Sequence, residues 1–154
     1  MNFRKLILFS TGLALFPSFT KAQLKKISSG VYELNAGHMS LQVDAERGAR
    51  IVSLRLAGKE TLSTVKIHPE NYGSTLWLSP QQNWGWPPYV VLDVKPYRVV
   101  ANTKNSITLQ SSPDSVSGCS MSKVITANCN DTSFSIVYTI TNISSKEKKL
   151  APWR

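Results

Sequence analysis

Ser133-Phe-Ser-Ile-Val-Tyr-Thr-Ile-Thr141 decides the fold of this 154-residue chain, because its side chains alternate along the whole stretch. The even-numbered residues are aromatic or aliphatic, and every odd-numbered residue except Val137 carries a hydroxyl group. In an extended strand these two sets lie on opposite faces. One apolar face and one wet face are typical of an antiparallel sheet that is buried on one side.

The same period of two recurs in several segments that precede this stretch, and polar or glycine-containing turns separate these segments. No segment shows a helical period. The sequence therefore predicts one all-β domain, an antiparallel β-sandwich whose strands are short and closely spaced. The predicted strands are 31–35, 39–43, 51–56, 97–101, 107–110, 120–126 and 134–141, with a further strand entering at 61–62 after a hairpin turn at 57–60.

Residues 1–22 have the features of a secretory signal peptide. Arg4-Lys5 form a basic start, Leu6 to Phe16 are mostly apolar, and Thr20-Lys-Ala22 offers small residues at the two positions that a signal peptidase reads. The apolar run is too short to span a membrane. We expect cleavage near Ala22, a mature domain over 23–154 in the periplasm or outside the cell, and no stable membrane insertion.

The charge of the mature chain is positive but scattered. The full sequence holds 18 Lys and Arg against 9 Asp and Glu; three of the basic residues and none of the acidic ones lie in 1–22, which leaves 15 against 9, or +6. Scattered positive charge on strands is usually a solvated face, so we expect no nucleic-acid partner. Weak attraction to an acidic polysaccharide or to a membrane surface stays open.

Cys119 and Cys129 are the two cysteines, in a chain expected to reach an oxidising compartment. If one extended strand carries both, ten residues at about 3.3 Å each separate their Cα atoms by roughly 33 Å. A disulfide requires a Cα separation of a few ångströms. Unless the strand breaks between them, the sequence predicts two thiols and no disulfide.

The segment Asn71–Tyr89 concentrates three of the four tryptophans, three prolines and four side-chain amides. Its proline and glycine content indicates a loop rather than a helix. An indole offers a broad apolar plate for the C–H face of a sugar ring, and amides offer paired donors and acceptors for its hydroxyls. We therefore predict a carbohydrate site, and Arg47 and Arg50 could add contacts to an acidic sugar. The predicted site residues are Trp77, Gln81, Gln82, Asn83, Trp84, Trp86 and Arg50.

Two other interpretations of this segment stay open. The tryptophans could simply be core, plugging one end of the sandwich. Glu70 and Asp93 bracket the loop and are the only acidic pair near it, as a glycosidase would need. His38 and His68 are isolated in the sequence, so we expect no metal site, and nothing indicates a cofactor.

Several segments together resemble the galactose mutarotase-like (aldose 1-epimerase-like) superfamily, and in particular a secreted bacterial branch of it. Its members share a large β-sandwich, so the resemblance implies a mutarotase-like supersandwich here. The first group of similar segments is Gly37–Asp44, Glu46–Arg55 and Gly58–Glu60. The second group is Asn71–Thr75, Trp77–Gln81, Trp84–Pro88, Thr139–Asn142 and Leu150–Trp153.

The resemblance also implies what this chain lacks. Mutarotases use a His as the acid and a Glu near the C-terminus as the base. Trp153 occupies the place of that His, and the Glu would fall beyond Arg154. A strand just begun at 150–154 suggests an N-terminal fragment with an incomplete sandwich. We expect a carbohydrate-binding or structural module without the catalytic pair; the alternative is an epimerase or other sugar-active enzyme whose catalytic residues lie in a missing C-terminal half.

Overall fold

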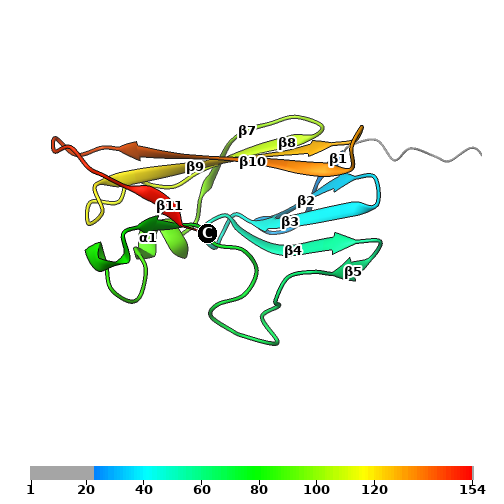
Figure 1. The fold of residues 1–154 in the computed structure, drawn as a ribbon. Helices are drawn as coiled ribbons and strands as arrows, with labels where there is room; N and C mark the ends of the chain where they lie inside the picture. The colour runs from blue at the N-terminus through cyan, green and yellow to red at the C-terminus, as the bar shows by residue number, and fades with distance from the viewer. Residues whose placement is uncertain (1–22, 154) are drawn as a thin grey trace, which may run out of the picture.

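The computed structural model describes residues 23–153 and shows an antiparallel β-sandwich, which confirms the predicted fold class (Figure 1). The signal peptide predicted over 1–22 lies outside the described residues. One layer is a five-stranded sheet made of β1 (Gln23–Ser28), β2 (Val31–Ala36), β3 (Met39–Asp44), β4 (Arg50–Leu56) and β5 (Lys59–Glu60) in that order. The other layer holds, from edge to edge, β10 (Ser133–Asn142), β9 (Cys119–Asn128), β8 (Ser106–Gln110) and β7 (Arg98–Asn102).

A small third sheet lies at one end of the sandwich. It pairs β6 (Trp77–Ser79) with β11 (Ala151–Trp153), so that the last described residues return to the tryptophan segment. Two short helices follow β6, namely the 3-10 helix η1 (Gln81–Asn83) and α1 (Val90–Asp93). The tryptophan segment is therefore mostly loop, as predicted, but it contains a strand and a helical turn that the sequence did not indicate.

The predicted strands agree with the structure to within two residues at each end, except at the hairpin between β4 and β5. There β5 begins at Lys59, two residues before the predicted entry at Thr61, because Ala57 and Gly58 alone form the turn with positive φ angles of 48° and 80°. Two strands were missed. β1 has only one half-buried side chain, and β6 is three residues long, so neither carries a detectable period.

The core lies between the two large sheets. Leu34, Leu41 and Val43 from the first sheet meet Ile107 and Ile125 from the second, all fully buried. The inward face of the edge strand β10 belongs to the same core but is only half-buried. The five-stranded sheet therefore covers the inward side chains of β9 fully and those of β10 only in part.

Lys123 lies on the buried face of β9, where it is the one charged residue among apolar side chains. Its ammonium Nζ donates hydrogen bonds to the carbonyl oxygens of Gly48 at 2.6 Å and Ala49 at 3.1 Å, and it lies 5.2 Å from the centre of the Tyr97 ring. A buried cation needs such partners to offset its desolvation. Lys123 thus joins the second sheet to the turn between β3 and β4.

Cys119 and Cys129 are not joined by a disulfide, as predicted. Cys119 is the first residue of β9 and is buried, whereas Cys129 follows the last residue of that strand. The strand runs unbroken over its ten residues, so the separation inferred from the sequence holds.

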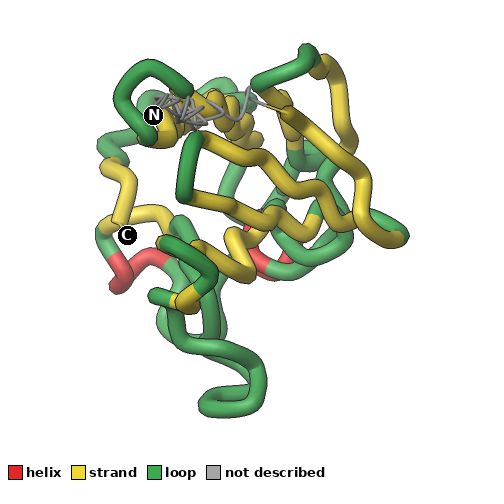
Figure 2. Tube along the Cα trace, turned by 90° about the vertical axis from the view of Figure 1, so that its right-hand side faces the viewer, coloured by secondary structure: helices red, strands yellow, loops and turns green. Residues whose placement is uncertain are grey.

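Two close backbone contacts fix the loops at the end of the sandwich that carries α1. The segment between β5 and β6 protrudes as a long loop in both views (Figures 1 and 2), and an antiparallel bridge from Ser74 to Ile51 ties its return path to β4. At Gly48 a Cβ atom would lie 1.9 Å from the carbonyl oxygen of Asp93. The turn before β4 and the end of α1 therefore approach each other as only a glycine allows.

We expect Gly48→Ala to lower the free energy of unfolding by about 3 kcal/mol or more, because the new methyl group would meet backbone and the φ angle of +61° is left-handed. Gly58→Ala is the matched control: its φ is +80°, but nothing lies within 4 Å of the added Cβ. It should lose only about 1 kcal/mol. Urea denaturation of both variants measures the difference, and equal losses would contradict the close contact.

Candidate functional site

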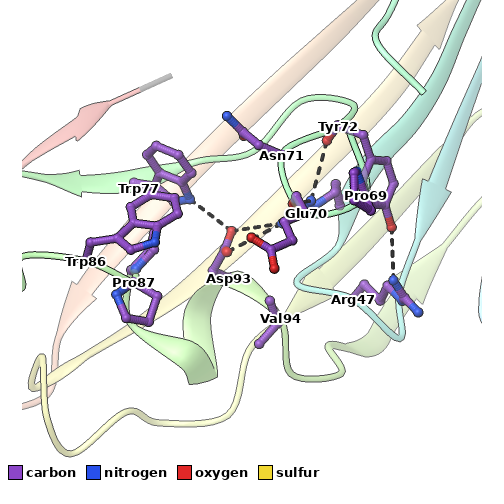
Figure 3. A pocket seen from close by; sticks show the side chains of 12 residues that line it. Arg47, Pro69, Glu70, Asn71, Tyr72, Trp77, Trp86, Pro87, Asp93 and Val94 are labelled. Atoms are coloured by element: carbon purple, nitrogen blue, oxygen red, sulfur yellow. Dashed lines mark hydrogen bonds and ion pairs between the residues drawn. The ribbon is translucent and has the colours of Figure 1, made fainter. Parts of the chain in front are cut away.

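A pocket of about 570 Å³ opens beside the tryptophan segment, within the size range of small-molecule sites. Three parts of the chain line it: the turn before β4, the end of the long loop, and the region from β6 to just past α1 (Figure 3). The side chains that matter below are Arg47, Arg50, Glu70, Asn71, Tyr72, Trp77, Trp86 and Asp93.

An ion pair forms the inner wall of this pocket. Nη2 of Arg50 lies 3.4 and 3.5 Å from the two carboxylate oxygens of Asp93, and the indole Nε1 of Trp77 donates to Asp93 Oδ1 at 2.9 Å (Figure 3). The arginine and aspartate side chains are 6% and 13% exposed. Charges this well buried persist only when paired, so Arg50 and Asp93 hold each other and orient Trp77.

Arg50 makes further contacts that fix the long loop. Its Nη1 donates to the carbonyl oxygen of Glu70 at 2.8 Å, and its guanidinium lies 4.9 Å from the centre of the Tyr72 ring. Its Nε is buried without a hydrogen-bond partner among the described residues. Arg50 thus lines the pocket, but its contacts hold the wall and the long loop in place. An arginine at the start of a strand is usually solvated, whereas this one is buried.

The four tryptophans form one cluster around Trp77. The centres of the Trp84, Trp86 and Trp153 rings lie 6.0, 5.8 and 5.7 Å from that of Trp77, and each meets it close to edge-on. Trp153 enters through β11, where it is paired with Trp77. Edge-to-face contacts of this kind stabilise a cluster beyond its buried area.

The structure separates the predicted site residues into two groups. Trp77, Trp86 and Arg50 line the pocket. Trp84 lies outside it, with its Nε1 donating to the carbonyl oxygen of Leu78 at 2.6 Å, so this indole ties the segment to β6. The three amides of η1, which are Gln81, Gln82 and Asn83, are exposed and also lie outside the pocket.

Other lining residues were not predicted as site residues. Tyr72 is buried, and its hydroxyl accepts a hydrogen bond from Nη1 of the exposed Arg47 at 3.3 Å. Glu70 and Asn71 are exposed and point into the same space (Figure 3). Three of them carry a signal in the sequence: Glu70 brackets the loop with Asp93, and Asn71 is one of the amides of the tryptophan segment. The third is Arg47, which the sequence analysis treats together with Arg50 as a contact to an acidic sugar.

The formal charges of the side chains that line the pocket are balanced, because two arginines, Arg47 and Arg50, face two acidic residues, Glu70 and Asp93. Of these four, Arg50 and Asp93 form an ion pair. The Asp93 carboxylate also acts on the interior: burial raises the pKa of the Tyr97 hydroxyl far above its ordinary value, and the charge of Asp93 adds to that rise. Within 23–153 no group of three or more His, Cys, Asp or Glu side chains could hold a metal ion, and no helix is long and apolar enough to span a membrane.

Comparison with known proteins does not assign this chain to a family. No protein-family model matches the chain, and no curated protein matches it.

Asp93→Asn should lower the free energy of unfolding by about 3 kcal/mol, because it leaves the buried Arg50 without its counter-charge. Arg55→Gln is the control, since it removes the other ion pair, with Glu60, at a side chain that is 46% exposed. That change should cost less than about 1 kcal/mol. Thermal or urea unfolding compares the two. A loss for Asp93→Asn as small as that of the control would show that the pair does not support the wall.

Proposed function

We propose that this protein is a secreted carbohydrate-binding module whose ligand enters the pocket beside Trp86. The observation that carries the proposal is the state of this one indole. Trp86 lines the pocket, yet 63% of its surface is exposed, while its ring and that of Trp77 meet edge-to-face. An ordered aromatic ring that faces solvent at the mouth of a pocket offers the apolar plate on which a sugar ring stacks.

Exposed polar side chains line the same pocket as the Trp86 ring. Arg47, Glu70 and Asn71 are exposed and line the same pocket, so they supply both donors and acceptors to ring hydroxyls. Asp93 contributes less, because both of its oxygens already accept hydrogen bonds from Arg50 or Trp77. The amides of η1 would meet only a ligand that extends beyond the pocket, which favours an oligosaccharide over a single sugar.

The proposal includes a mutarotase-like fold and export from the cytoplasm. The antiparallel sandwich supports the first, together with the resemblance of the segments that build β3, β4 and β6. The basic and apolar pattern of 1–22 supports the second. With Trp153 in the place of the mutarotase His, an indole would stand where the acid should be, and an indole cannot exchange a proton with a ring oxygen.

A sugar-active enzyme, in first place a mutarotase-like epimerase, is the second candidate. One observation favours it: the carboxylates of Glu70 and Asp93 line one pocket, as acid–base chemistry on a sugar requires. Asp93 is held in its ion pair with Arg50 as part of the pocket wall. Glu70 is therefore the carboxylate in this pocket that could exchange a proton with a sugar.

Trp86→Ala should weaken oligosaccharide binding about five- to thirtyfold, because stacking on an indole contributes roughly 1–2 kcal/mol. The variant should keep its melting temperature, since the ring is mostly exposed. Trp153→Ala is the matched control, a tryptophan in the same cluster that is 43% exposed but does not line the pocket. Calorimetry with neutral and acidic oligosaccharides provides the affinities.

Two results would reject the binding role. One is that no oligosaccharide binds the wild-type protein. The other is that Trp86→Ala unfolds the protein and no binding defect can be separated from that loss, which would favour the interpretation of the tryptophans as a plug.

Glu70→Gln distinguishes the module from the enzyme. For a binding module, the wild-type protein should anomerise an aldose no faster than buffer, and the substitution should change only affinity. Polarimetry or NMR follows the anomers directly. Faster anomerisation by the wild-type protein that Glu70→Gln abolishes would establish the enzyme in place of the module.

A further inference from the structure

The outer edge of β10 is the longest strand edge that stays uncovered in the described part of the chain. β10 pairs with β9 over ten residues without a register shift, and no strand of residues 23–153 lies on its other side. The outward N–H and C=O groups of an edge strand form a ready template for another strand.

β10 also lacks the features that usually protect an edge. It contains no charged residue, no proline and no bulge. The opposite edge of the same sheet, β7, carries Arg98 and a register shift after Val99, and the edge strand β1 of the other sheet carries two lysines and a register shift. Edges of soluble domains are commonly blunted in these ways, so the plain edge of β10 stands apart from the other two.

The inward face of β10 gives a second reason to expect a neighbour. On β9, Met121 and Ile125 are fully buried, whereas Ile140 and Ile136, which pair with them across the strands, are only half-buried. Apolar surface that continues the core therefore reaches solvent along this edge. A strand added beside β10 would cover it while satisfying the backbone groups.

The geometry points to a second copy of this chain as the occupant, with the two β10 strands paired antiparallel about a two-fold axis at Val137. In this register Val137 faces itself, Phe134 faces Ile140 of the second copy, and Ile136 faces Tyr138 of the second copy. Apolar residues thus meet on the inward face and hydroxyl-bearing residues on the outward face. Such an interface is isologous and closes as a dimer.

Charge at the two ends of β10 suits this arrangement. Asp131 precedes the strand and accepts a hydrogen bond from Ser133 Oγ. Lys146 follows it and is held at its end, because its carbonyl oxygen accepts from Asn142 Nδ2 at 2.7 Å. Antiparallel pairing about Val137 places Asp131 of one copy opposite Ile143 of the other, three residues before Lys146, so opposite charges lie near each other at both ends of the dimer.

Sedimentation over a concentration series tests this edge, and we expect a monomer–dimer equilibrium. Val137→Lys places two like charges directly opposite each other and should raise the dimer dissociation constant about tenfold or more. Val137 is 57% exposed, so the monomer should keep its melting temperature. Val100→Lys is the matched control, a change of the same kind on β7 at the opposite edge, where the side chain is 44% exposed. It should leave the equilibrium unchanged.

A charge exchange tests the register. Asp131→Lys or Lys146→Asp alone should weaken the dimer several-fold, and the two together should restore it. The inference is overturned if the wild-type protein is monomeric up to its highest soluble concentration. It is equally overturned if Val100→Lys rather than Val137→Lys breaks the dimer, if the double exchange does not restore it, or if Val137→Lys leaves larger assemblies intact. None of these results depends on oligosaccharide binding.

Discussion

The ion pair between Arg50 and Asp93 is the constraint on which the end of this sandwich depends. Arg50 is the first residue of β4 and Asp93 the last of α1, and Trp77 of β6 adds its indole N–H to the same carboxylate. One contact therefore joins three elements that lie far apart in the sequence. A buried charge pair contributes little net stability, but breaking it on one side is costly, so its main effect here is to fix geometry.

That geometry determines what remains for a ligand. With Asp93 and Arg50 satisfied by each other and by the loop, the pocket presents an exposed indole and a few exposed polar side chains. Trp77 plays a different role from Trp86, because it lies at the centre of the tryptophan cluster and is held by its own hydrogen bond. An inner tryptophan that is hydrogen-bonded and packed against an outer one holds the outer ring in place, which lowers the entropy cost of stacking a ligand on it.

The sandwich was predictable because the period of two is a local property of each strand, and in β9 and β10 it persists over many residues. The composition of Asn71–Tyr89 located the tryptophan segment but did not reveal how its residues divide between the pocket and the rest of the fold. Nothing local distinguishes Trp84, bonded to the Leu78 carbonyl, from Trp86, which faces solvent. The contact of Arg50 with Asp93 and the pairing of β11 with β6 depend on long-range packing, so sequence patterns could not reveal them.

The indole N–H signals of the four tryptophans offer the most direct test of the proposed carbohydrate site. In a heteronuclear NMR titration with an oligosaccharide, we expect the Trp86 signal to shift most and the Trp77 signal to follow, while the Trp84 signal, bonded to the Leu78 carbonyl outside the pocket, stays close to its starting position. A titration that leaves Trp86 unmoved, or that moves Trp84 alone, would contradict binding in this pocket.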